Sequence, residues 1–166
     1  WQSAGVVTAC VRDISLTGES VNWFVAGPTG SERRNAALKD FAAVIMRKDP
    51  PFDSEYFYAT HLLQQAQREG ANVVNAPQAL RDHPEKLAIM EFSTFLSPTL
   101  VSRNTADIKA FHAEHQDIIL KPLDGMGGAG IFRVKADGVN LGSIIETLTH
   151  DGRQIEIVEK FIPAIN

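Results

Sequence analysis

The sequence DIILKPLDGMGGAGIFRV, residues 117–134, contains the feature that decides the fold. Gly125, Gly127 and Gly130 have the G-x-G-x-x-G spacing of dinucleotide-binding loops. In those proteins the loop follows a strand and opens a helix, because the pyrophosphate binds at the N-terminus of that helix. Here residues 131–135 are alternating, β-branched and aromatic, which predicts a second strand. The glycines are therefore predicted to join two strands as a hairpin, and a dinucleotide site is excluded.

A glycine hairpin of this kind allows two interpretations. Its backbone N–H groups are not covered by side chains, so the loop could close on an anionic phosphate as a lid. Lys121 favours this interpretation, because Pro122 biases it toward an extended conformation that places its ammonium group beside the loop. The alternative is a structural hairpin with a solvated lysine, and glycine spacing alone does not separate the two.

Composition limits the kind of protein to which this loop belongs. The chain has 166 residues, which is enough for one core or two small lobes. With 16 basic and 20 acidic residues its formal charge is −4, which favours a small-molecule partner over nucleic acid or a membrane surface. No apolar run reaches the roughly 18 residues that a membrane span requires. Cys10 is the single cysteine, so the chain is predicted to be cytoplasmic, with Cys10 buried.

The first half of the chain is predicted to alternate strands with turns and to end in βαβ order. Residues 27–35, rich in Gly, Pro and Ser, are predicted to form a loop, and residues 41–46 a buried parallel strand. The other predicted elements are strands at residues 4–16, 21–27 and 72–77, and a helix that begins at Asp53 or Ser54, ends at Gly70 and buries Phe57, Leu62, Leu63 and Ala66.

The second half is predicted to form a compact α+β lobe, with a domain boundary between residues 81 and 84. Asn104 or Thr105 is predicted to cap a helix that ends near His115. The other predicted elements are short helices at residues 77–82 and 84–92, strands at residues 99–103, 117–123, 130–135 and 154–162, and a helix at residues 141–150.

Four segments resemble bacterial glutathione synthetases of the ATP-grasp superfamily. They are MRKDPPFD (46–53), VVNAPQALRDHPEKL (73–87), ILKPLDGMGGAGIFRV (119–134) and FIPAI (161–165). The resemblance covers nearly the whole chain and is weakest before Phe41. It implies an α/β (α+β) chain with the ATP-grasp fold. Residues 1–82 would be the remainder of an N-terminal pre-ATP-grasp α/β domain, and residues 83–166 the central ATP-grasp lobe with its glycine-rich lid.

The same resemblance implies an activity. Enzymes of this kind join the carboxylate of γ-glutamylcysteine to glycine through an acyl phosphate, and they release glutathione, ADP and phosphate. The implied cofactors are ATP and Mg²⁺, the implied partners are small molecules, and a homo-oligomer is compatible with the resemblance. Two alternatives are another ATP-grasp peptide or amino-acid ligase and a nucleotide-binding module without catalysis.

The nucleotide site implied by the resemblance has three parts. Two lysines are expected on the phosphates, the glycine loop forms a lid, and the end of the last strand meets the adenine. This strand carries Glu159 and Lys160 at positions where close relatives are expected to have neutral amides. The expected ATP-binding residues are Lys86, Lys121, Asp124, Gly125, Met126, Gly127, Gly128, Ala129, Gly130, Glu159, Lys160, Phe161 and Ile162.

Two parts of the family pattern are not recognised in this sequence. One is the opening segment of the first domain, and the other is the downstream lobe that supplies the acidic and Asn ligands of Mg²⁺ and the arginines that bind substrate. No catalytic residue and no metal ligand are therefore assigned, and the chain is expected to be a fragment that is inactive by itself. Residues 47–53 are interpreted either as a rigid connection or as a contact with substrate.

Overall fold

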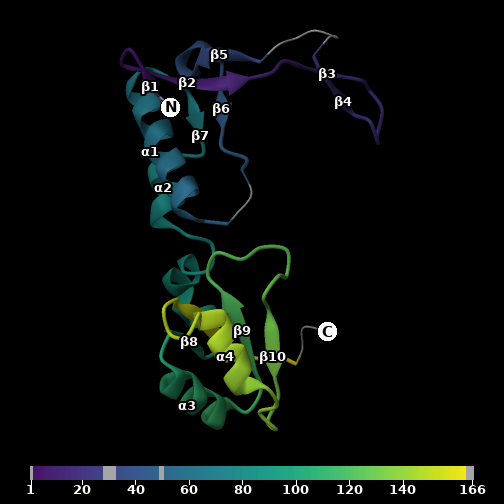
Figure 1. Cartoon of the computed structure of the whole chain (residues 1–166), viewed down its shortest axis with the longest axis vertical. Helices are drawn as coiled ribbons and strands as arrows, with labels where there is room; N and C mark the ends of the chain where they lie inside the picture. The colour runs from purple at the N-terminus through teal and green to yellow at the C-terminus, as the bar shows by residue number, and fades with distance from the viewer. Residues whose placement is uncertain (1, 28–32, 49–50, 164–166) are drawn as a thin grey trace. The chain divides into compact units, whose positions relative to one another are not determined.

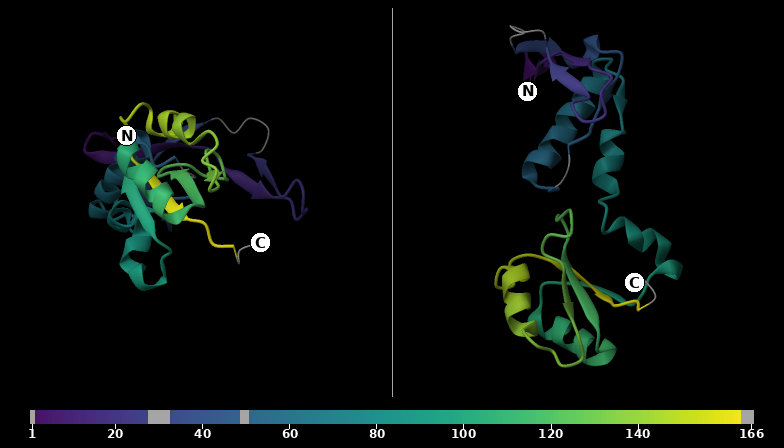
Figure 2. Two further views of the ribbon diagram at one scale, coloured as in Figure 1. Left: turned by 90° about the horizontal axis from the view of Figure 1, so that it is seen from below. Right: turned by 90° about the vertical axis from the view of Figure 1, so that its right-hand side faces the viewer.

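A computed structural model describes residues 2–27, 33–48 and 51–163 of the chain. The chain divides into two compact units, whose elements are shown in Figures 1 and 2. One unit contains Trp1–Lys48 and Phe57–Asp82, and the other contains Asp49–Tyr56 and His83–Asn166. Each unit has its own hydrophobic core.

The first unit contains an antiparallel three-stranded sheet. Its central strand β2 (Val6–Val11) pairs with β1 (Gln2–Ser3) on one side and with β5 (Arg34–Ala37) on the other. The 3₁₀ helix η1 (Leu38–Asp40) follows β5 directly. The core of this unit consists of Val7, Leu38, Leu63, Ala66, Ala71 and Val73.

A βαβ segment completes the first core. The strands β6 (Val44–Ile45) and β7 (Val73–Val74) pair in parallel, and α1 (Ser54–Arg68) connects them. Asp53 caps α1, because its carboxylate accepts a hydrogen bond of 2.8 Å from the N–H of Tyr56. Gly70 follows the helix with a φ of +102°, a conformation that glycine adopts without strain. The predicted βαβ order and the predicted helix ends are confirmed.

Several local predictions for the first unit are wrong. Residues 41–46 do not form a buried strand, because β6 has two residues and Ile45 is exposed. Phe57 and Leu62 of α1 are exposed, and the helix instead buries Tyr56, Thr60, Leu63 and Ala66. Cys10 is exposed as well.

The predicted loop at residues 27–35 also needs correction. Its last two residues belong to β5, which pairs with β2, and residues 28–32 lie outside the described part of the chain. The strands β3 (Ile14–Leu16) and β4 (Phe24–Ala26) form a separate antiparallel hairpin, and every residue of both strands is exposed.

The second unit is built on a four-stranded antiparallel sheet in the order β10-β9-β11-β8. The strands are β8 (Thr99–Ser102), β9 (Ile118–Pro122), β10 (Phe132–Val134) and β11 (Glu156–Lys160). Two helices, α3 (Thr105–His115) and α4 (Leu141–Thr149), pack on one face of this sheet (Figures 1 and 2). The core between them consists of Ile108, Ile118, Leu120, Val134, Leu141, Ile145, Leu148 and Val158.

The predictions for three further helical segments are confirmed to different degrees. Asn104 caps α3 through a hydrogen bond of 2.8 Å from the N–H of Ala106, as predicted. The segment α2 (Pro77–Asp82) is helical, as predicted. The helix predicted at residues 84–92 is confirmed only in part: the chain forms the 3₁₀ helix η2 (Ala88–Phe95), without a side-chain cap and with a kink at Phe92. Among the described residues, no helix is both long and apolar enough to cross a membrane.

The glycine loop joins β9 to β10, which pair in antiparallel fashion with Leu120 opposite Phe132. The predicted hairpin is therefore confirmed, and no helix follows the glycines. Gly127 and Gly128 have φ values of +65° and +80°, so both adopt the left-handed conformation that favours glycine.

Glu156 of β11 is a carboxylic acid inside the second core. It pairs with Ser102 of β8 and Pro122 of β9, and it is fully buried. Neither carboxyl oxygen has a hydrogen-bond partner among the described residues. Burial, together with the negative charge of Asp124, raises the pKa of Glu156 from its ordinary value of 4.5 to about 8. The side chain is therefore neutral at pH 7.

We expect Glu156→Gln to change how stability depends on pH. The unfolded chain loses the Glu156 proton near pH 4.5 and the folded chain near pH 8, so the free energy of unfolding falls as pH rises between these values. Glutamine does not ionise, so the advantage of the variant over the wild type should grow by roughly 3–4 kcal/mol from pH 5 to pH 8. Urea unfolding at both pH values measures this, with Glu146→Gln on the exposed surface of α4 as the control. Parallel changes in the wild type and Glu156→Gln would contradict the prediction.

We expect Gly125→Ala to destabilise the second unit. A methyl group at this position would lie 2.6 Å from Cγ of Pro122 and 3.3 Å from the carbonyl oxygen of Ala129, and neither group can move freely. The free energy of unfolding should fall by about 1–3 kcal/mol. The matched control is Gly142→Ala in α4, where no atom lies within 4 Å, and this change should be neutral or stabilising by up to about 1 kcal/mol. Equal urea midpoints for the two variants would show that the loop does not pack against Pro122.

Candidate functional site

A cavity of about 310 Å³ lies beside the glycine loop of the second unit. It is bordered by the backbone and side chains of loop residues 125–129. Charged side chains reach it from the segment before η2, from β9 and from β11; they are Glu85, Lys86, Lys121 and Glu159. Apolar side chains complete its lining; they are Ile89, Pro122, Met126, Ile131 and Ile157.

The alternation of side chains along β9 and β11 explains why Lys121 and Glu159 meet there. Successive residues of a strand point to opposite faces of the sheet. In β9, Ile118 and Leu120 face the helices, which leaves Lys121 on the opposite face. In β11, Val158 faces the helices and Glu159 faces the cavity. The two strands are adjacent, so the two charged side chains lie on the same face and at neighbouring positions.

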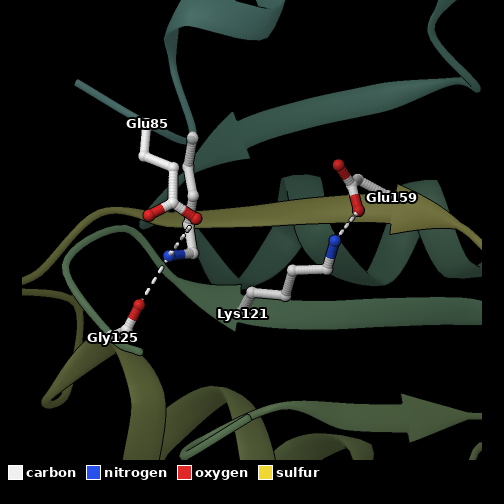
Figure 3. A network of polar contacts seen from close by, with 5 residues as sticks. Glu85, Lys121, Gly125 and Glu159 are labelled. Atoms are coloured by element: carbon white, nitrogen blue, oxygen red, sulfur yellow. Dashed lines mark hydrogen bonds and ion pairs between the residues drawn. The ribbon is translucent and has the colours of Figure 1, made fainter. Parts of the chain in front are cut away.

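Lys121 and Glu159 form an ion pair within the cavity. The ammonium group of Lys121 donates a hydrogen bond to Oε2 of Glu159, and the two side chains point toward each other in Figure 3. Their exposed fractions are 28% and 20%, so water screens the pair less than it would at the open surface. An anionic ligand that binds Lys121 must therefore compete with the Glu159 carboxylate.

Lys86 contacts the glycine loop. Its Nζ donates a hydrogen bond of 2.6 Å to the carbonyl oxygen of Gly125 (Figure 3), and its side chain is only 16% exposed. Glu85 is the nearest acidic partner, at 3.9 Å, and its side chain is largely exposed. Within the described chain, the N–H groups of Gly127 and Gly128 have no hydrogen-bond acceptor. The cavity therefore offers two ammonium groups and free backbone donors, which are the groups that bind phosphate oxygens.

A second cavity of about 310 Å³ shares Lys121 and Glu159 with the first. Its remaining lining is mostly apolar and comes from the end of η2, from β9 and from the end of β11; it consists of Phe95, Leu96, Ser97, Ile119, Lys160, Phe161 and Ile162. The ion pair thus borders a cavity with phosphate-binding groups and a cavity with aromatic and aliphatic walls. Together the two cavities suit a ligand with an anionic part and a planar, largely apolar part.

The structure brings most of the predicted site residues together. The first cavity contains Lys86, Lys121, Gly125, Met126, Gly127, Gly128, Ala129 and Glu159, and the second contains Lys160, Phe161 and Ile162. Asp124 and Gly130 line neither of these two cavities. Gly130 instead packs close to Pro122, where a methyl group would lie 3.2 Å from the ring.

Several residues that line the two cavities were not predicted from the sequence. They are Glu85, Ile89, Phe95, Leu96, Ser97, Ile119, Pro122, Ile131 and Ile157. A signal was present for two of these, since strand alternation puts Ile119 on the face of Lys121 and Ile157 on the face of Glu159. The residues of η2 and its end gave no such signal, because their place depends on the kinked path of that segment.

The cavity residues do not form a metal site. In the described ranges, no group of three or more His, Cys, Asp or Glu side chains could hold a metal ion. Mg²⁺ prefers near-octahedral oxygen ligation. Of the two acidic side chains in the first cavity, Glu159 is already paired with Lys121 and Glu85 is largely exposed. These residues alone do not fit Mg²⁺.

Comparison with solved structures identifies the fold of this site. D-cycloserine synthetase matches with a TM-score of 0.58 and 17% identity, over 76% of this chain and 46% of that protein. A RimK domain ATP-grasp protein from Sphaerobacter thermophilus matches with a TM-score of 0.55 and 22% identity, over 75% of this chain and 47% of that protein. At these identities the similarity concerns the fold alone, and it confirms the predicted ATP-grasp fold.

Sequence comparisons identify the family. The model of the prokaryotic glutathione synthetase N-terminal domain matches residues 1–81, and the model of the prokaryotic glutathione synthetase ATP-grasp domain matches residues 85–166. The glutathione synthetase of Ralstonia nicotianae is 53% identical over 163 residues, which are 98% of this chain and 49% of that protein. The glutathione synthetase of Shewanella oneidensis is 48% identical over 161 residues, which are 97% of this chain and 50% of that protein. The chain thus spans about half the length of these relatives, and it belongs to the prokaryotic glutathione synthetase family.

Proposed function

We propose that this chain is the nucleotide-binding part of an ATP-dependent ligase that joins γ-glutamylcysteine to glycine. The reaction proceeds through an acyl phosphate and gives glutathione, ADP and phosphate. The observation that carries the proposal is the convergence of Lys86, Lys121 and the glycine loop on one cavity. The choice of substrates is supported by the relatives that bear the name glutathione synthetase.

In this proposal the first cavity receives the phosphates of ATP. Lys86 and Lys121 supply positive charge, and the N–H groups of Gly127 and Gly128 supply backbone donors. Phosphoryl transfer depends mainly on positioning and on neutralising charge, so these groups are suited to it without a protein nucleophile. Both lysines already have partners within the protein, so phosphate binding exchanges one contact for another.

The adenine is assigned to the second cavity. Phe161 and Ile162 follow β11 and form one part of its wall, and Phe95 and Leu96 at the end of η2 form another. Aromatic and aliphatic walls bind a planar purine through its apolar faces. Glu159 and Lys160 provide the polar groups at its edge in this proposal.

Asp124 and Gly130 keep a role as the two ends of the lid in this proposal. Gly130 has a φ of +72° and packs near Pro122, so it shapes the loop without lining either cavity. Asp124 lies near enough to Glu156 for its charge to act on that carboxyl group. The lid as a whole is residues 124–130.

ATP-grasp enzymes use ATP together with Mg²⁺. The residues of this chain do not fit the ion by themselves, so the proposal assigns no ligand of Mg²⁺ to them. We also propose that residues 1–82 belong to the N-terminal pre-ATP-grasp domain and residues 83–166 to the central ATP-grasp lobe. The two family matches, which end at residue 81 and begin at residue 85, support this division. The low net charge supports small-molecule partners, and the single cysteine supports a cytoplasmic protein.

A chimera tests the proposed activity. Residues 1–166 would replace the matching segment of the Ralstonia glutathione synthetase, to which they are 53% identical. ADP release with γ-glutamylcysteine and glycine supports the proposal. Release only with other acceptors would favour a different ATP-grasp ligase. A folded chimera that binds ATP but releases no ADP with any acceptor would favour a nucleotide-binding module.

We expect Lys121→Met to weaken ATP use in this chimera by about ten- to a hundredfold, measured as kcat/KM for ATP. Methionine keeps most of the side-chain volume and removes the charge, and a charge-assisted contact is worth about 1.5–3 kcal/mol. Lys109→Met on the exposed surface of α3 is the matched control and should leave kcat/KM unchanged. Unchanged ATP kinetics in a folded Lys121→Met protein would remove Lys121 from the nucleotide site.

We expect nucleotide to protect the glycine loop from proteolysis. If residues 124–130 close over phosphates, cleavage within them should slow at least severalfold when ATP and Mg²⁺ are added to the chimera. The exposed turn between β3 and β4 provides an internal control, because its cleavage should not depend on nucleotide. Cleavage of the glycine loop at one rate with and without saturating ATP would favour the structural hairpin.

A further inference from the structure

Asp117, Arg133 and Phe161 form a closed cluster at the β9–β10 edge of the second sheet. Nε and Nη2 of Arg133 donate hydrogen bonds to Oδ1 and Oδ2 of Asp117 at 3.0 and 2.8 Å. This bidentate arrangement fixes the plane of the guanidinium group as well as its position. The side chains of Arg133 and Asp117 are 39% and 34% exposed, so the pair lies at the margin of the sheet.

Phe161 is held by both other members of the cluster. Its N–H donates a hydrogen bond of 2.9 Å to the carbonyl oxygen of Asp117. Its ring lies under the guanidinium group of Arg133, with 3.4 Å between Cζ and the ring centroid. Asp117 therefore fixes the backbone of Phe161 directly and fixes its ring through Arg133. A cation over an aromatic face at this distance is an attractive contact.

The cluster is connected to the second cavity through Phe161. Phe161 lines that cavity together with Lys121 and Glu159, whereas Arg133 lines neither cavity. In the β9–β10 pairing, Arg133 lies opposite Ile119, which also lines the second cavity. Paired residues of antiparallel strands share a face of the sheet, so Arg133 is on the same face as the cavity. It can thus act on the cavity by way of the ring that it covers.

The ion pair of Asp117 and Arg133 favours the ionised form of the Asp117 carboxyl group. The hydrogen bonds from Arg133 lower the pKa of the Asp117 carboxyl group below its ordinary value of 3.8. Asp117 therefore stays ionised at neutral pH and remains an acceptor for the guanidinium group.

We infer that Arg133 is a positioning residue for the nucleotide site, because it holds the Phe161 ring in place as a wall of the second cavity. The inference rests on the proposed assignment of that cavity to the adenine. A ring that is already fixed loses no further freedom when a base packs against it, whereas a free ring must be ordered on binding. Loss of the Arg133 contact should therefore weaken nucleotide binding by about fivefold.

The test uses the 166-residue chain and NMR titration with ATP, which measures weak as well as tight binding. We expect Arg133→Met to raise the Kd about fivefold, and Arg133→Lys to do nearly the same, because lysine keeps the charge but not the planar, bidentate group. Phe161→Leu should also raise the Kd, and adding Arg133→Met to it should have little further effect. The matched control is Arg34→Met, which breaks an ion pair of 3.3 Å in the first unit.

A second measurement follows the cluster without nucleotide. The pKa of Asp117, read from its carboxyl carbon, should rise toward 3.8 in Arg133→Met and stay low in Phe161→Leu. If Arg133 only stabilised the fold, its replacement would lower the melting temperature, and this effect would not depend on Phe161. The double mutant and the comparison with Arg133→Lys distinguish that role from positioning. Arg133→Lys also replaces Arg133→Met in the test if Arg133→Met does not fold.

The outcomes separate the inference from the proposed function. Wild-type chain that binds ATP, with weaker binding in both Arg133 variants and no additivity with Phe161→Leu, supports the inference. Wild-type chain that binds ATP with the same Kd as the Arg133 variants overturns it and leaves the proposed function in place. Full additivity of the two substitutions also overturns it, because Arg133 would then act independently of Phe161. A wild-type chain without shifts at residues 119–121 and 159–162 on addition of millimolar ATP contradicts both.

Discussion

The antiparallel pairing of β9 with β11 is the constraint on which both the second core and the candidate site depend. In this register Lys121 lies opposite Ile157, and Ile119 lies opposite Glu159. A shift of one residue would turn the side chains of a strand to the other face of the sheet. Lys121 or Glu159 would then be buried against α3 and α4 without its partner, which is strongly unfavourable for a charge. The packing of the core therefore also places the charged groups of the cavity.

The two lysines of the first cavity have partners within the protein before any ligand binds. Lys121 is neutralised by Glu159, and Lys86 is bound to the carbonyl oxygen of Gly125. These contacts spare two largely buried ammonium groups the cost of being unpaired. They also set a threshold for ligands, because only an anion that attracts the lysines more strongly than these partners do can replace them. A phosphate chain satisfies this condition better than a neutral molecule does.

How far the sequence predicts this arrangement can be judged from particular residues. The alternation of residues 131–135 predicts the hairpin, and the resemblance places Lys86 and Lys121 at one site. The sequence does not predict the walls at Phe95 and Leu96, because these follow a kinked 3₁₀ helix whose path depends on tertiary packing. Burial along α1 is missed for a similar reason: the helix turns Tyr56 and Thr60 inward, whereas apolarity alone selects Phe57 and Leu62.

The two sides of the candidate site differ in how firmly contacts within the protein hold them. On the side of the second cavity, Phe161 is held by its backbone, through Asp117, and by its ring, through Arg133, so this wall is fixed by contacts along the sheet edge. On the side of the first cavity, Gly125 is held by Lys86, but Gly127 and Gly128 carry no side chains that could fix them in the same way. The fixed wall suits a planar group, and the glycine loop suits a charged group. A flat base is recognised by shape, whereas phosphate oxygens are matched by donors that can move toward them.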